Sequence, residues 1–76
     1  MEKEIPSRLT TLGHPQRLAI FRLLMRRYPD RMLAGEIAGA LDLKASTLST
    51  YLSALMQGGL VTQERAGTSL LYTVDM

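Results

Sequence analysis

The fold follows mainly from residues 33–74, which read LAGEIAGALDLKASTLSTYLSALMQGGLVTQERAGTSLLYTV. The spacing of the apolar residues predicts one helix over Leu33–Leu41 and a second over Ala45–Gln57, because these residues recur every three or four positions. Asp42–Lys44 leaves room only for a tight turn between the two helices. Together these segments predict a helix-turn-helix unit over about residues 33–57.

The second helix of this unit has two chemically different sides. Its large apolar residues are spaced for burial, and they are Leu48, Leu52, Leu55 and Met56. Most other positions carry short hydroxyl side chains, namely Ser46, Thr47, Ser49, Thr50 and Ser53. A helix side that is merely solvated more often carries Glu, Lys or Gln, which form helices better than Ser and Thr. Short hydroxyls allow close approach and can bond several base edges, so we expect this helix to enter the DNA major groove. Ser46 is alternatively placed to cap the helix N-terminus.

A β-hairpin is expected directly after the two helices. Gly58-Gly59 predicts a left-handed helix end, and the strands are expected over Leu60–Arg65 and Leu70–Val74, with a short loop at Gly67. The hairpin, about residues 60–75, completes the predicted fold class: mainly α with a β-hairpin wing (α+β), a winged helix-turn-helix.

Two more helices are predicted before residue 33. The first begins at Pro6 and Ser7 and ends at Gly13. The second runs from Pro15 to Arg27 and stops before Pro29, because the residue preceding a proline disfavours the helical conformation. One face of this second helix is expected to carry Leu18, Phe21, Leu24 and Met25, with Ile20 and Leu23 alongside.

The composition excludes several classes of protein. Residues 1–76 suffice for one small domain. The charged N-terminus is no signal peptide, and no apolar run approaches the ~18 residues of a membrane span. We therefore expect a cytoplasmic protein without membrane contact. Cysteine is absent and His14 is the only histidine, so no zinc site, metal or cofactor is expected, and His14 is assigned to helix capping. With no nucleophile–base set and no phosphate-binding glycine loop, no enzyme is expected.

The net charge of +2 is distributed unevenly along the chain. Residues 1–31 contain seven of the nine basic side chains, whereas residues 32–76 contain only Lys44 and Arg65 against four acidic ones. Non-specific DNA affinity scales with the number of phosphates neutralised. The helix-turn-helix and wing are therefore expected to contribute little non-specific affinity.

These residues resemble the winged-helix repressors of the ArsR family. The similarity begins at Leu12–Ile20, LGHPQRLAI, and continues through Glu36–Ala38 and Leu41–Leu43. It extends through Ser46–Ser49 and Leu52 to Gly59–Val61 and the Gly67 wing, so that it covers about residues 5–75. The resemblance implies a homodimer that binds double-stranded DNA.

The chain also departs from that family. Members often carry Arg-His where this chain has Thr50-Tyr51, and a basic residue where it has Thr68, so both changes remove positive charge. The soft-metal sensors place a Cys-x-Cys pair where this chain has Leu33-Ala34-Gly35. In other members a C-terminal helix carries a metal site and forms the dimer, and this helix would begin beyond Met76. Either the protein dimerises unusually, or, as we expect, that helix is missing and these residues are part of something longer.

The leading hypothesis is a transcriptional repressor that binds a pseudo-palindromic operator as a homodimer. Lys44 would bind a phosphate and Ala45 a thymine methyl group. Base edges or phosphates would be contacted by Ser46, Thr47, Ser49 and Thr50, and the wing contact would consist of Arg65, Gly67 and Thr68. Residues 32–76 carry few basic side chains, which leaves a winged-helix protein–protein interaction module as an alternative. A regulatory N-terminal domain of a longer chain is a third.

Overall fold

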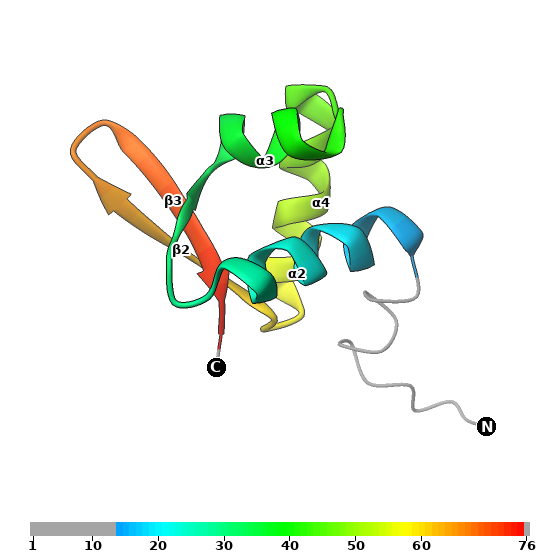
Figure 1. The fold of residues 1–76 in the computed structure, drawn as a ribbon, viewed down its shortest axis with the longest axis horizontal. Helices are drawn as coiled ribbons and strands as arrows, with labels where there is room; N and C mark the ends of the chain where they lie inside the picture. Colours follow the sequence, from blue (N-terminus) through cyan, green and yellow to red (C-terminus); the bar gives the residue numbers. More distant parts are fainter. Residues whose placement is uncertain (1–13, 76) are drawn as a thin grey trace.

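The computed structural model describes residues 14–75 and contains the predicted winged helix-turn-helix (Figure 1). Its elements in chain order are α2 (Pro15–Arg27), β1 (Met32–Leu33), α3 (Ala34–Leu41), α4 (Ala45–Gln57), β2 (Val61–Ala66) and β3 (Ser69–Val74). The helix predicted over residues 6–13 lies outside the described residues.

Helix α2 has the predicted limits. Pro15 occupies the first turn, where no backbone donor is needed. The backbone N–H of Gln16 donates to Nδ1 of His14 at 3.3 Å, so the assignment of His14 to helix capping is confirmed. The side chains buried from α2 are Ile20, Leu23 and Leu24. Met25 was expected to share a face with Leu24, but Leu24 is fully buried, whereas the next 100° step along the helix turns Met25 outward, where it is 46% exposed.

Helix α3 begins one residue later than predicted. Leu33 is in an extended conformation and precedes the helix, and its backbone N–H donates to Oε1 of Glu36 at 2.9 Å. Glu36 thereby satisfies a donor that the first helical turn cannot satisfy internally. The helix ends at Leu41, where Asp42 takes a left-handed conformation with φ of 55°.

Helix α4 also has the predicted limits, and its end forms a Schellman motif. The N–H of Leu60 donates to the carbonyl of Leu55 at 3.0 Å, and that of Gly59 to the carbonyl of Met56 at 3.1 Å. Gly59 is left-handed, with φ of 75°, whereas Gly58 keeps right-handed helical angles. The predicted glycine cap therefore depends on Gly59 alone for its positive φ.

The sheet has three antiparallel strands in the order β1-β3-β2. Strands β2 and β3 form the expected hairpin, paired from Val61↔Val74 to Ala66↔Ser69. Gly67, with φ of 64°, and Thr68 form a two-residue loop with positive φ only at its first position, as in a type II′ turn. Strand β1 was not predicted: Met32 and Leu33 pair with β3 instead of continuing into α3.

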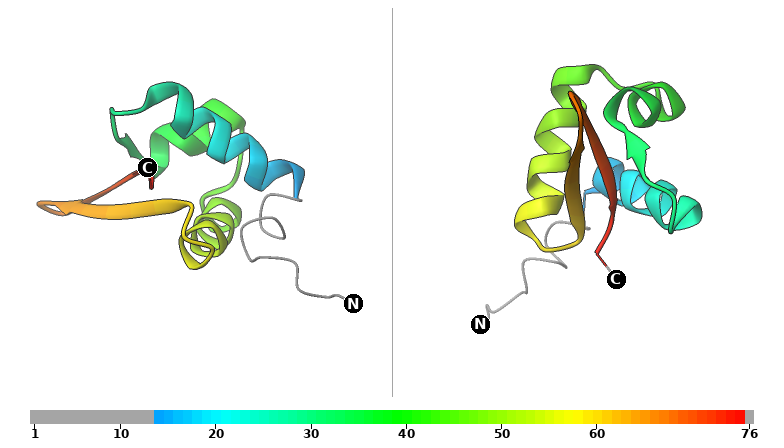
Figure 2. Two further views of the ribbon diagram at one scale, coloured as in Figure 1. Left: turned by 90° about the horizontal axis from the view of Figure 1, so that it is seen from below. Right: turned by 90° about the vertical axis from the view of Figure 1, so that its left-hand side faces the viewer.

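The hydrophobic core lies between the helices and one face of this sheet. Its largest fully buried side chains are Ile20, Leu24, Ile37, Leu48, Leu52 and Leu55. Viewed from below, α2 and α3 lie on one side of the molecule, and α4 lies on the other, near the level of the hairpin (Figure 2, left). The α4 side opposite its leucines is therefore free of other described elements. Within residues 14–75, no helix combines the length and apolarity that a membrane crossing requires.

Candidate nucleic-acid interface

The turn between α3 and α4 sets the position of the fourth helix. Beyond the left-handed Asp42, the N–H of Leu43 donates to the carbonyl of Ala38 at 2.9 Å, and the half-buried Leu43 side chain packs against the core. Lys44 is the N-cap residue of α4, with extended backbone angles and no side-chain capping bond. The alternative role of Ser46 as N-cap was therefore wrong, because the helix already begins at Ala45.

The exposed side of α4 carries a stripe of hydroxyl groups, which we call the hydroxyl stripe: Ser46, Ser49, Thr50 and Ser53. Their spacing of three and four residues places them on one helix face. The three core leucines of α4 lie on the opposite face, so the predicted phase of this helix is confirmed. Thr47 is half-buried and lies beside the stripe, and Lys44 and Ala45 are exposed at its N-terminal end.

One hydroxyl in this stripe is partly engaged by the helix itself. Oγ1 of Thr50 donates to the backbone carbonyl of Ser46 at 3.2 Å. The proton of Thr50 is thus directed inward, while its oxygen can still accept a hydrogen bond. Toward a groove, Thr50 would therefore present an acceptor and a methyl group.

Tyr51 joins α4 to the start of α2. Its hydroxyl donates to Oε1 of Gln16. Its ring lies 5.0 Å from that of His14, measured between centroids, and the guanidinium carbon of Arg17 lies 5.8 Å from the Tyr51 centroid. Tyr51 is half-buried, and these contacts hold α4 in place. Sequence reasoning missed Gln16 and Arg17, because nothing local marks a contact between residues 35 positions apart.

The predicted wing residues form a second group, separate from the α4 residues. Arg65, Gly67 and Thr68 are exposed near the tip of the hairpin, which projects away from the helices (Figures 1 and 2). The structure thus places the predicted contacts at two locations, the start of α4 and the hairpin tip.

The charges near the wing are partly compensated. Arg31 forms an ion pair with Glu64, the neighbour of Arg65, and both side chains are about half exposed at 50% and 56%. Such an exposed pair contributes little stability, but it offsets a carboxylate that would repel phosphate. Arg22 and Arg26 are also exposed, but they belong to α2 and not to the predicted contacts. Among the residues predicted to contact DNA, Lys44 and Arg65 are the two that carry a positive charge.

Within residues 14–75, no three side chains of His, Cys, Asp or Glu converge as a metal site would require. The absence of a metal and of a cofactor stays a prediction, which calorimetry can test.

The comparison with protein families identifies the chain's relatives. A family model described as a helix-turn-helix domain matches residues 12–64, from the start of the LGHP sequence into β2. This chain belongs to that helix-turn-helix family, as a winged helix of the ArsR type. The family assignment rests on most of the chain, including both helices of the helix-turn-helix unit.

Three relatives illustrate the similarity. An uncharacterised HTH-type transcriptional regulator of Mycobacterium tuberculosis, Rv0081, is 34% identical over 64 residues, which are 84% of this chain and 54% of that protein. The chain thus spans about half the length of the curated relatives it matches. The Mycobacterium bovis protein Mb0332 is described as a homodimeric winged helix-turn-helix DNA-binding domain, with a TM-score of 0.83, 31% identity, and coverage of 92% of this chain and 62% of that one. The repressor BigR of Xylella fastidiosa has a TM-score of 0.81 and 27% identity, with coverage of 92% and 68%.

Proposed function

We propose that this domain binds double-stranded DNA and regulates transcription, as a repressor that binds a pseudo-palindromic operator as a homodimer. The observation that carries the proposal is the hydroxyl stripe of α4, which is exposed, free of long side chains and backed by three buried leucines. The relatives support it, because Mb0332 is described as a homodimeric DNA-binding domain and BigR as a repressor.

In this proposal α4 enters a major groove. Ser46, Thr47, Ser49 and Thr50 would contact base edges or phosphates, and Ala45 would contact a thymine methyl group. Lys44, at the start of the helix, would bind a phosphate and so fix the register of α4 on the duplex.

The wing makes the second contact of each protomer. Arg65, Gly67 and Thr68, at the hairpin tip, would lie along the neighbouring minor groove or the backbone. The domain acts by binding and without catalysis, in the cytoplasm.

Alanine substitution of two stripe residues tests the proposal. The probe is a duplex selected from a random library for binding to the unmodified protein. Replacing Ser49 and Thr50 together by Ala should weaken binding by about 1–3 kcal/mol for each lost base contact. The circular dichroism spectrum should stay unchanged, because both side chains are exposed. Thr62→Ala, which removes an exposed hydroxyl from β2, is the control and should bind normally. Unchanged affinity in the double variant would exclude α4 as the recognition helix.

A second candidate function is a winged-helix module that binds another protein. The charge distribution favours it, because residues 32–76 carry only two basic side chains. Random duplex DNA separates the two functions. A DNA-binding domain should bind it at about 50 mM salt and lose affinity steeply by about 200 mM, whereas an interaction module should show no binding at either concentration.

A further inference from the structure

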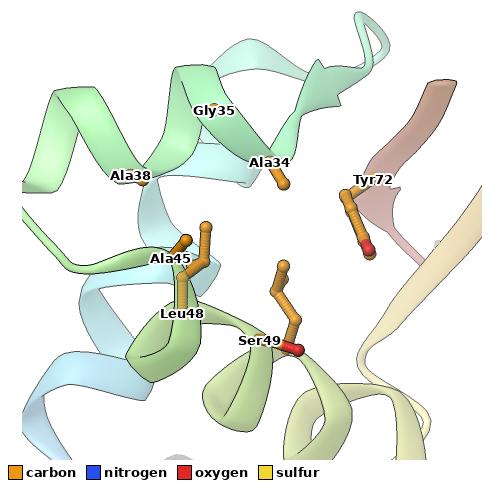
Figure 3. A pocket seen from close by; sticks show the side chains of 8 residues that line it. Ala34, Gly35, Ala38, Ala45, Leu48, Ser49 and Tyr72 are labelled. Atoms are coloured by element: carbon orange, nitrogen blue, oxygen red, sulfur yellow. The ribbon is translucent and has the colours of Figure 1, made fainter.

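A cavity of about 150 Å³ lies between α3, α4 and β3 (Figure 3). Small residues form much of its wall: α3 contributes Ala34, Gly35 and Ala38, and α4 contributes Ala45 and Ser49 together with two core leucines. Tyr72 of β3 closes the remaining side. Gly35, Ala45 and Ser49 are exposed, so the cavity opens to solvent beside them.

The chemistry of this wall is specific in two respects. No charged side chain lines the cavity, and the hydroxyl groups among its lining residues belong to Ser49 and Tyr72. The Tyr72 hydroxyl accepts a hydrogen bond from Nε2 of Gln63 at 2.9 Å, which fixes this wall to the neighbouring strand. Ser49 carries a hydroxyl that can donate or accept. The wall thus suits a mostly apolar, uncharged molecule with one polar group.

Helix α3 has a glycine, Gly35, in the wall of this cavity. A Cβ atom added there would meet nothing within 4 Å, and the same holds for Gly39, one helical turn further on. Neither glycine is therefore required by a close neighbour, although glycine is unfavourable inside a helix. Only Gly35 lines the cavity. The two positions thus form a matched pair for testing whether the space matters.

We propose that this cavity is a binding site for a small uncharged molecule, about the size of one aromatic ring with a single hydroxyl group. An apolar protein cavity of about 150 Å³ holds a molecule the size of benzene. The uncharged wall would exclude a carboxylate or an ammonium group, because it offers no partner for a desolvated charge.

The site would also regulate DNA binding, an extension that rests on the proposed function. Ala45 and Ser49 line the cavity and also belong to the proposed α4 contacts. A bound molecule that engages Ser49 would withdraw it from the DNA and would hold α4 and β3 apart. Ligand and operator would then weaken each other's binding by the same factor, as linkage requires.

The site itself is tested without DNA, by titrating the protein with phenol and following backbone amide signals by NMR. We expect saturable shifts at Ala34, Gly35 and Ser49, with a Kd of about 1 mM. Benzoate, which has the same ring with a charge, should bind at least about tenfold more weakly. The proposed site would be overturned if the shifts do not saturate, if they are confined to other residues, or if benzoate binds as tightly as phenol.

Substitution of the two glycines, Gly35 and Gly39, provides a second test of the ligand site. Gly35→Leu should fill part of the cavity and weaken phenol binding by at least about tenfold, since the ligand needs that volume. Gly39→Leu adds the same side chain to the same helix outside the cavity and should leave the phenol Kd unchanged. Equal effects of the two substitutions would overturn the proposal. The amide spectrum reports whether each variant is folded. If a variant does not fold, the comparison of phenol with benzoate in the unmodified protein still tests the site.

The regulatory part is tested on the selected duplex with and without saturating phenol. Phenol should weaken DNA binding by at least about threefold in the unmodified protein and in Gly39→Leu, but not in Gly35→Leu. If phenol binds without changing the DNA affinity, the proposed regulation is overturned, while the proposed binding site stands. If no duplex is bound at all, the proposed function and the regulation fail, while the titration without DNA still decides the site.

Discussion

Removing the ammonium group of Lys44 should flatten the salt dependence of DNA binding without disturbing the fold. Lys44 is exposed at the N-cap of α4, and its side chain makes no capping hydrogen bond. Lys44→Ala therefore removes one positive charge from the proposed interface and little else. Arg65 at the wing remains as the other positive charge among the proposed contacts.

The size of the effect follows from the number of cations at the interface. Each phosphate neutralised changes the slope of log K against log salt by about −0.9. With Lys44 and Arg65 as the contacts of each protomer, a dimer should show a slope of about −3.6, and the Lys44→Ala dimer about −1.8. Between about 50 and about 200 mM salt, the unmodified protein should lose affinity about 150-fold and the variant only about 12-fold.

Fluorescence anisotropy of a labelled duplex at a series of salt concentrations measures both slopes. Arg22→Ala is the matched control: it also removes one exposed positive charge, but from α2, outside the proposed contacts. Its slope should equal that of the unmodified protein. Equal slopes for Lys44→Ala and the unmodified protein would falsify the placement of Lys44 at a phosphate. A flattened slope in Arg22→Ala would place α2 at the DNA instead.

Three further predictions concern stability and metal binding. Leu52→Ala should lower the free energy of unfolding, measured in urea, by about 2–5 kcal/mol, because Leu52 is 2% exposed. The neighbouring Ser53→Ala should change it by less than about 0.5 kcal/mol. A similar loss in both variants would contradict the observed phase of α4. Tyr51→Phe should cost about 0.5–1.5 kcal/mol through loss of the hydrogen bond to Gln16, and nothing further in a Gln16→Ala background; additive losses would mean that the bond contributes no stability. Calorimetry should detect no tight binding of zinc or arsenite to residues 1–76, because they contain one histidine and no cysteine. Stoichiometric binding with a Kd of about 1 μM would refute this prediction.

The limits of the two long helices could be predicted from the sequence because their signals are local. Pro15 begins α2, the leucine period of α4 selects its buried side, and Gly59 permits the left-handed helix end. The exposure of the hydroxyl stripe follows from the same period, since a helix that buries every third or fourth residue must expose the others. The candidate contacts at Ser49 and Thr50 therefore needed no tertiary information to be placed on the surface.

Other features depend on contacts between distant parts of the chain. Strand β1 has only two residues, too few for a period, and it exists because β3 passes beside it some 40 positions later, so that Met32 pairs with Tyr72. The cavity lined by Gly35 and Ser49 requires three separate elements to meet. Local sequence sets backbone preference and the side of a helix that is apolar, whereas pairing partners and enclosed space are set by how the elements pack. For this protein the sequence alone determined the helices and their exposed residues, and the tertiary structure decided the third strand, the anchoring of Tyr51 to Gln16 and the cavity beside α4.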